Sequence, residues 1–240
     1  MTPDEPGWPE DRDGFRLRGM EMTRTETFTD AAFAFSVSLL VIASQSVPTT
    51  FDELRRAMAG VPAFGVSFLF IMLFWYGHWK WSRRYGLEDL QSIFLSCVLV
   101  FATLVYVYPL KFVYLLLTNY LAGATSGSGI RTMSELYQLF AIYGAGYAAM
   151  NLVLAGLNGW AYRKRTELGL NEIETYLTVS QIWNWLIPAA VGTVSVTLAL
   201  TMPPVRFFFP IPAMLYMLLG VLMPWHSRRS RRRLQALRLR

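Results

Sequence analysis

Six long apolar segments run through this chain of 240 residues and restrict its fold more than any other feature. A helix needs roughly 20 apolar residues to cross a hydrocarbon core of about 30 Å. The segments lack the strict alternation expected of strands in a membrane barrel. The sequence therefore predicts an all-α membrane protein with six transmembrane helices. We expect them over residues 28–47, 61–79, 93–117, 136–157, 182–202 and 207–225.

Composition supports lipid as the solvent of this chain. Hydrophobic residues make up 54% and charged residues only 16%, whereas soluble globular domains carry about 25% charged residues. Cys97, the single cysteine, lies inside an apolar segment, which excludes a disulfide framework or a thiolate metal site within one chain. The net charge of +6 comes from tails and loops and does not indicate a nucleic-acid partner.

The uneven placement of lysine and arginine predicts the orientation. Most of the 22 basic residues fall before the first segment, after the second, after the fourth and at the C-terminus. Because basic residues accumulate on the cytoplasmic side, we expect both termini to be cytoplasmic. The chain is therefore predicted to have a cytoplasmic N-terminal tail at 1–23, a six-helix transmembrane domain at 24–226 and an Arg-rich cytoplasmic tail at 227–240.

The C-terminal tail is strongly basic. Each basic residue near a membrane surface contributes about 1 kcal/mol of attraction to anionic lipid, so the tail is a candidate for anionic lipid binding. A simple topology anchor explains the same residues equally well. The arginines concerned are Arg228, Arg229, Arg231, Arg232 and Arg233.

Asp30 lies about one turn inside the first predicted helix, and an intramembrane charge indicates function by default. The second predicted helix runs back toward the cytoplasm and places His78 at the same depth in the membrane as Asp30. A polar cluster of Arg24, Asp30 and His78 is therefore geometrically possible. Such a cluster would clamp the two helices together. Alternatively, Thr29 and Asp30 simply cap the first helix.

A stripe of bulky apolar and small polar side chains follows on the first helix. Phe35, Ser38, Leu39 and Ile42 recur at three- and four-residue spacing and share one face. Spacing alone leaves tight helix packing and pore lining equally open. The sequence has no nucleotide-binding loop, HExxH motif or Ser/His/Asp arrangement, which argues against an enzyme.

Arg24, Phe28, Thr29 and Asp30 stand at a recognisable spacing: Arg, three residues, then Phe-Ser-Asp, with Thr in place of Ser. This pattern, the run at 34–42, and Phe74-Trp75 followed by His78 resemble the transmembrane protein 175 family. These are endosomal and lysosomal potassium channels with shorter, six-helix bacterial relatives.

The resemblance implies a homotetramer whose four first helices line a central pore without a Gly-Tyr-Gly filter. Phe35, Leu39 and Ile42 would form apolar rings, with Ser38 as a small polar layer, and such constrictions can gate by losing water. Arg24, Phe28, Thr29, Asp30 and His78 would support the helix structurally. The implied function is a potassium-preferring cation channel in a bacterial plasma membrane. Potassium is then the permeant ion, and no cofactor is needed.

Two other classes of function stay open at this point. A secondary transporter would show ionisable groups near the midplane or interrupted helices in repeated halves. Pro109 and Pro188 could mark interruptions, but no midplane carboxylate or lysine accompanies them. A non-conducting membrane scaffold is the second alternative, and a monomeric state would favour it.

Overall fold

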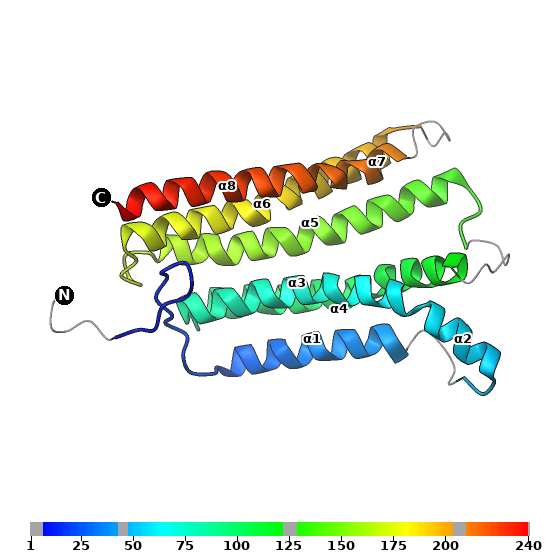
Figure 1. Cartoon of the computed structure of the whole chain (residues 1–240), viewed down its shortest axis with the longest axis horizontal. Helices are drawn as coiled ribbons and strands as arrows, with labels where there is room; N and C mark the ends of the chain where they lie inside the picture. Colours follow the sequence, from blue (N-terminus) through cyan, green and yellow to red (C-terminus); the bar gives the residue numbers. More distant parts are fainter. Residues whose placement is uncertain (1–6, 43–47, 122–128, 204–209, 240) are drawn as a thin grey trace.

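A computed structural model of the chain describes residues 7–42, 48–121, 129–203 and 210–239. The described part is a bundle of helices (Figure 1), and its only strand-like feature is an isolated antiparallel bridge between Glu10 and Arg16. The helices are α1 (Arg24–Ile42), α2 (Phe51–Ala59), α3 (Val61–Tyr85), α4 (Leu90–Leu121), α5 (Met133–Arg163), α6 (Glu172–Thr201), α7 (Pro210–Met214), the 3-10 helix η1 (Leu215–Leu218) and α8 (Leu219–Arg238).

The bundle is layered. α1 lies along one edge against α3 and α4, while α5 and α6 pack together on the other side of that pair. α8 runs beside α6 at the opposite edge (Figure 1). The N-terminal segment and the end of α8 lie at the same end of the bundle.

Local signals fix where several helices begin. Thr50, Thr132 and Asn171 each accept a hydrogen bond from the third helical N–H, and a glutamate at that position bonds back to the cap residue. This reciprocal capping box satisfies backbone donors that the first helical turn would leave unpaired. α3 ends at Gly86, whose φ of 58° lies in the left-handed region that glycine adopts easily.

Within the described residues, four helices have the length and apolar composition to cross a membrane, namely α3, the Leu90–Val113 part of α4, α5 and α6. All the elements of the described part are helices, which confirms the all-α prediction. α1 has 19 residues and includes Arg24, Glu26 and Asp30. Six spans per chain stay a prediction.

A sixth helix is predicted over 207–225, of which 207–209 lie outside the described residues. The structure divides the rest into α7, η1 and α8. α7 begins at Pro210, the first residue that the structure describes after 203. α8 then continues beyond the predicted end, through the arginine-rich tail to Arg238. Leu234, which is buried, anchors this tail to the bundle.

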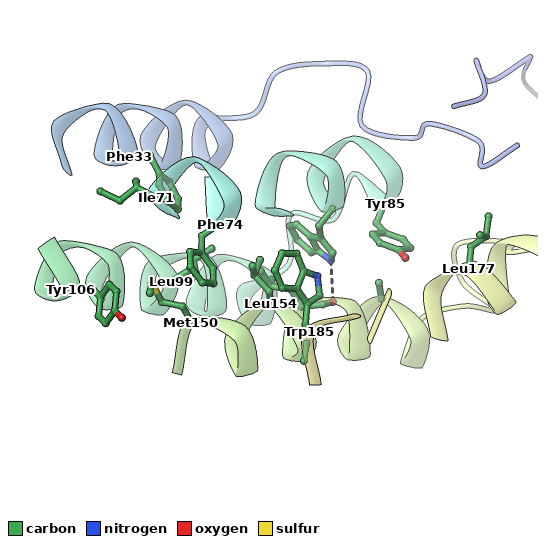
Figure 2. Packing of buried hydrophobic residues seen from close by; sticks show 14 of the residues in the cluster. Phe33, Ile71, Phe74, Tyr85, Leu99, Tyr106, Met150, Leu154, Leu177 and Trp185 are labelled. Atoms are coloured by element: carbon green, nitrogen blue, oxygen red, sulfur yellow. Dashed lines mark hydrogen bonds between the residues drawn. The ribbon is translucent and has the colours of Figure 1, made fainter. Parts of the chain in front are cut away.

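The core joins α1, α3, α4, α5 and α6. Phe33, Ile71, Phe74, Leu99 and Met150 belong to one cluster of buried side chains, which Figure 2 shows from close by. The packing of Trp185 of α6 against α3 depends on a glycine. A Cβ atom at Gly77 would lie 2.5 Å from Cζ2 of Trp185, so only glycine leaves room for this indole. Small residues permit such approach between membrane helices.

Candidate functional site

The first helix has two unlike faces. One packs into the bundle, and its opposite face has no partner in the described chain. The buried face comprises Glu26, Thr29, Phe33, Ser36 and Leu40. The outward face carries Phe28, which is exposed, and then Phe35 and Ser38, about two and three turns further on. Phe35 is 57% exposed, a large apolar surface for a helix whose other side is fully packed.

The predicted stripe divides between these faces. Phe35 and Ser38 point outward, whereas Leu39 is half-buried and packs against the core. Ser38 Oγ donates a hydrogen bond to the carbonyl of Ala34 at 3.0 Å. The side chain of Ile42 lies outside the described residues, although its backbone ends α1.

Asp30 ties α1 to α3. The indole Nε1 of Trp75 donates a hydrogen bond to Asp30 Oδ1 at 2.7 Å. Thr29 is fully buried and its Oγ1 donates to the carbonyl of Thr25 at 2.8 Å. A clamp between these two helices exists, and its partner on α3 is Trp75.

His78 joins α3 to α4 instead. It is 2% exposed, and its Nε2 lies 2.9 Å from Ser96 Oγ. Because Ser96 Oγ donates its proton to the carbonyl of Ser92, the His78 Nε2 must carry the hydrogen of this pair. Arg24 is exposed and has no ion-pair partner among the described residues. The structure thus does not bring Arg24, Asp30 and His78 into one hydrogen-bonded group.

The Trp75 to Asp30 contact can be tested directly. Replacing Trp75 by Phe keeps most of the ring but removes the N–H, leaving the carboxylate without its donor. A hydrogen bond to a charged acceptor stabilises by about 2 kcal/mol, so we expect Trp75→Phe to lower the melting temperature of the detergent-purified protein. Trp79→Phe is the matched control, because Trp79 stacks on Trp75 and the hydrogen bond to Asp30 comes from Trp75. Equal melting temperatures for the two variants would contradict the role of this contact.

The N-terminal segment before α1 is folded against the bundle. Phe15 is completely buried and meets the ring of Tyr85 edge-on, with 5.4 Å between the ring centroids. The guanidinium carbon of Arg84 lies over the Phe15 ring, 4.7 Å from its centroid. An aromatic side chain held in this way fixes the path of the chain into α1.

Glu174 is the centre of one set of ion pairs. Its carboxylate is fully buried and accepts hydrogen bonds from the guanidinium groups of Arg16 and Arg18, with nearest distances of 2.9 Å for both. The Arg16 backbone N–H donates to the same carboxylate at 3.0 Å. Glu174 also closes the capping box of α6 with Asn171. One carboxylate therefore holds the N-terminal segment to the start of α6.

Arg84 forms the second set. Its guanidinium is 3% exposed and donates to Asp11 Oδ2 at 2.6 Å and to Asp13 Oδ2 at 3.0 Å. Further along the chain, Arg238 Nη2 donates to the Asp13 carbonyl at 2.7 Å. The N-terminal segment thus connects the ends of α3, α6 and α8.

Sequence reasoning treated residues 1–23 as a tail and missed these contacts. A signal is present in the alternation of Asp11, Asp13, Arg16 and Arg18 around the apolar Phe15 and Leu17, which is unusual for a solvated tail. Their ion-pair partners lie far away in the sequence: Arg84 pairs with the two aspartates, and Glu174 pairs with the two arginines.

The Asp11 contact predicts a pH dependence. Burial raises the pKa of Asp11, but the neighbouring Arg84 guanidinium and backbone N–H donors outweigh it and hold the pKa below the ordinary 3.8. Because the folded pKa is lowered, the stabilisation is present above 3.8 and disappears as pH falls through the folded value. The melting temperature of wild type should therefore exceed that of Asp11→Asn at neutral pH. This difference should vanish in strong acid, and a constant difference would contradict the assignment.

These features define a helical membrane protein whose first helix has an unpartnered face and a polar attachment to the second long helix. Residues 24–109 match the family described as endosomal/lysosomal potassium channel TMEM175. A relative from Marivirga tractuosa, named a potassium channel, is 36% identical over 196 residues that cover 79% of each chain.

Two solved structures have a similar fold. A crystal structure of a variant of the potassium channel MtTMEM175, bound to a nanobody-MBP fusion, gives a TM-score of 0.83 at 32% identity, covering 93% of this chain and 100% of that one. A lysosomal potassium-selective channel TMEM175 homolog from Chamaesiphon minutus gives 0.53 at 16% identity, covering 86% and 96%. At that identity the second likeness concerns the fold alone.

The chain belongs to the TMEM175 family, as its sequence pattern predicts. The family and the relatives compared are channels and not enzymes, and they indicate no cofactor. The chain is accordingly an integral membrane protein.

Proposed function

We propose that this protein is a potassium-preferring cation channel in which α1 lines the pore. The observation that carries this proposal is the outward face of α1, where Phe35 is 57% exposed beside Ser38 while the other face is packed. The potassium channel from Marivirga tractuosa, which matches 79% of this chain, supports the same ion. We place the channel in a bacterial plasma membrane with both termini cytoplasmic, an orientation that agrees with the distribution of basic residues.

The proposed channel is a homotetramer. A single chain contributes one copy of the α1 stripe, and a pore needs several copies around an axis. Identical subunits commonly assemble with closed cyclic symmetry. In such an assembly the α1 stripes of the four subunits would face one another around the symmetry axis. Six spans per chain result when α1 and the α7 to α8 region cross the membrane together with the four apolar helices.

Permeation in this proposal passes an apolar constriction of Phe35, Leu39 and Ile42 with Ser38 between them. Narrow apolar rings exclude water and can close a path without a moving gate. The Ser38 hydrogen is already donated to the Ala34 carbonyl, so its oxygen lone pairs are free to face a passing cation. Selectivity then arises from the partial loss of hydration water, without a Gly-Tyr-Gly filter.

The experiment that tests the function is potassium flux into liposomes that contain the purified protein, with the channel from Marivirga tractuosa as positive control. A dye that reports membrane potential should show potassium-driven polarisation, smaller with sodium. Absence of flux while the control conducts would overturn the proposal. Saturable, gradient-coupled uptake would indicate a transporter, and a monomer by native mass measurement would indicate a scaffold.

A further inference from the structure

A groove between α6 and α8 changes in character along its length. It has a volume of about 670 Å³ and is lined at one end by Arg229, Arg233, His226 and Ser230. The other end is lined by apolar side chains, which include Ile187, Ala190 and Leu222. No acidic residue is among the described residues that line it. α8 follows the edge of the bundle here (Figure 1).

The two lining arginines are held in place by aromatic rings. The guanidinium carbon of Arg229 lies 5.6 Å from the ring centroid of Trp225, and that of Arg233 lies 5.6 Å from the ring of Tyr176. Neither has a carboxylate partner within the described chain, in contrast to Arg16, Arg18 and Arg84. Stacking against a ring leaves the N–H donors of a guanidinium available to bind an anion.

The polar end of the groove has a fixed width. Ser180 Oγ of α6 is 2.7 Å from Ser230 Oγ of α8, and His226 Nε2 is 3.2 Å from the Ser180 carbonyl. These contacts bridge the two helices beneath the arginines. The groove mouth is therefore a preformed feature between two helices.

The change from a basic end to an apolar end of the groove also corresponds to increasing depth in the membrane. Trp183 and Trp225 line the groove between its two ends, and tryptophans of membrane proteins concentrate at the interface between headgroups and hydrocarbon. The arginines then lie at headgroup level and Ala190 and Leu222 at acyl-chain level. An amphiphile with a negative headgroup matches both ends, whereas a soluble anion matches only one.

We infer that this groove binds an anionic phospholipid from the leaflet that faces the two chain termini. Arg229 and Arg233 bind the phosphate, and one acyl chain lies along Ile187, Ala190 and Leu222. The sequence suggested lipid binding for five tail arginines as a group, and the structure separates them. Arg228 and Arg232 are exposed and do not line the groove, and Arg231 lines a separate pocket with Asp13 and Arg84.

The test is native mass spectrometry of the purified full chain with added dioleoylphosphatidylglycerol or dioleoylphosphatidylcholine. Wild type should bind phosphatidylglycerol in preference. The double variant Arg229→Gln/Arg233→Gln should weaken this binding about 30-fold, as expected for the loss of two interfacial charges. The matched control, Arg228→Gln/Arg232→Gln, removes the same charge from another face of α8 and should bind like wild type. Equal losses in the two double variants would overturn the site.

A second arm separates the lipid from a soluble phosphate ester. Ala190→Trp fills the acyl-chain end without changing a charge and should reduce phosphatidylglycerol binding, while the melting temperature reports whether the variant is folded. Glycerol phosphate at the same concentration should not displace the lipid from wild type. Displacement by glycerol phosphate, or unchanged binding by folded Ala190→Trp, would overturn the proposal.

Discussion

Replacing Phe35 by Ala is expected to raise potassium flux on the order of tenfold, the effect of lowering a barrier by about 1.4 kcal/mol. Four phenyl rings around a pore axis would form its narrowest and driest level. Alanine widens that level and lowers the free energy of wetting it. Because the Phe35 side chain is 57% exposed in one chain, its loss should leave the fold intact. Liposome flux per reconstituted channel is the measurement.

Phe101→Ala is the control for this result. Phe101 is also a large exposed aromatic, at 69%, but lies on α4, which is not the helix proposed to line the pore. It should leave flux unchanged. Ser38→Ala should alter the preference for potassium over sodium because it removes the hydroxyl layer. If neither the Phe35 nor the Ser38 variant changes permeation, α1 does not line the pore through this face.

Replacing Glu174 by Gln should produce the largest loss of stability, about 3 kcal/mol, typical of breaking a buried ion pair. The carboxylate is 0% exposed and its arginine partners are 18% and 10% exposed. Gln keeps the size of the side chain but leaves both guanidinium groups without a counter-charge. The N-terminal segment should then detach, and tryptic cleavage after Arg16 or Arg18 should accelerate roughly a hundredfold, in proportion to the open population.

Glu172→Gln serves as the matched control for this variant. Glu172 lies in the same first turn of α6 but is exposed, so its neutralisation should change neither the melting temperature nor the cleavage rate at Arg16 and Arg18. Cleavage at equal rates in both variants would mean that Glu174 does not hold the segment.

The sequence predicts the helices well because their cause is local. A long apolar run must form a helix in lipid, since every backbone polar group needs a partner within the segment. The helix ends are less predictable, because they depend on caps outside the apolar runs. α5 starts after Thr132 and α6 after Asn171, and α6 thereby begins well before its predicted start at residue 182.

The contacts around Asp30 show where sequence reasoning stops. Membrane level predicts that Asp30 and His78 lie close together, but which α3 residue contacts Asp30 depends on the rotation of that helix. Trp75 and His78 are three residues apart and so point about 60° apart. Packing turns Trp75 toward α1 and His78 toward Ser96 of α4. No spacing rule within either helix fixes that rotation.

The N-terminal segment has a consequence for how the protein is made. Arg18 leaves the ribosome long before its partner Glu174, which follows 156 residues later. At ordinary rates of synthesis this delay is about 10 to 30 seconds. The N-terminal segment that leads into α1 can become fixed only after the start of α6 has emerged. The contact between Asp13 and Arg238 forms last. Subunits that meet before then would join through a first helix whose end is still unattached.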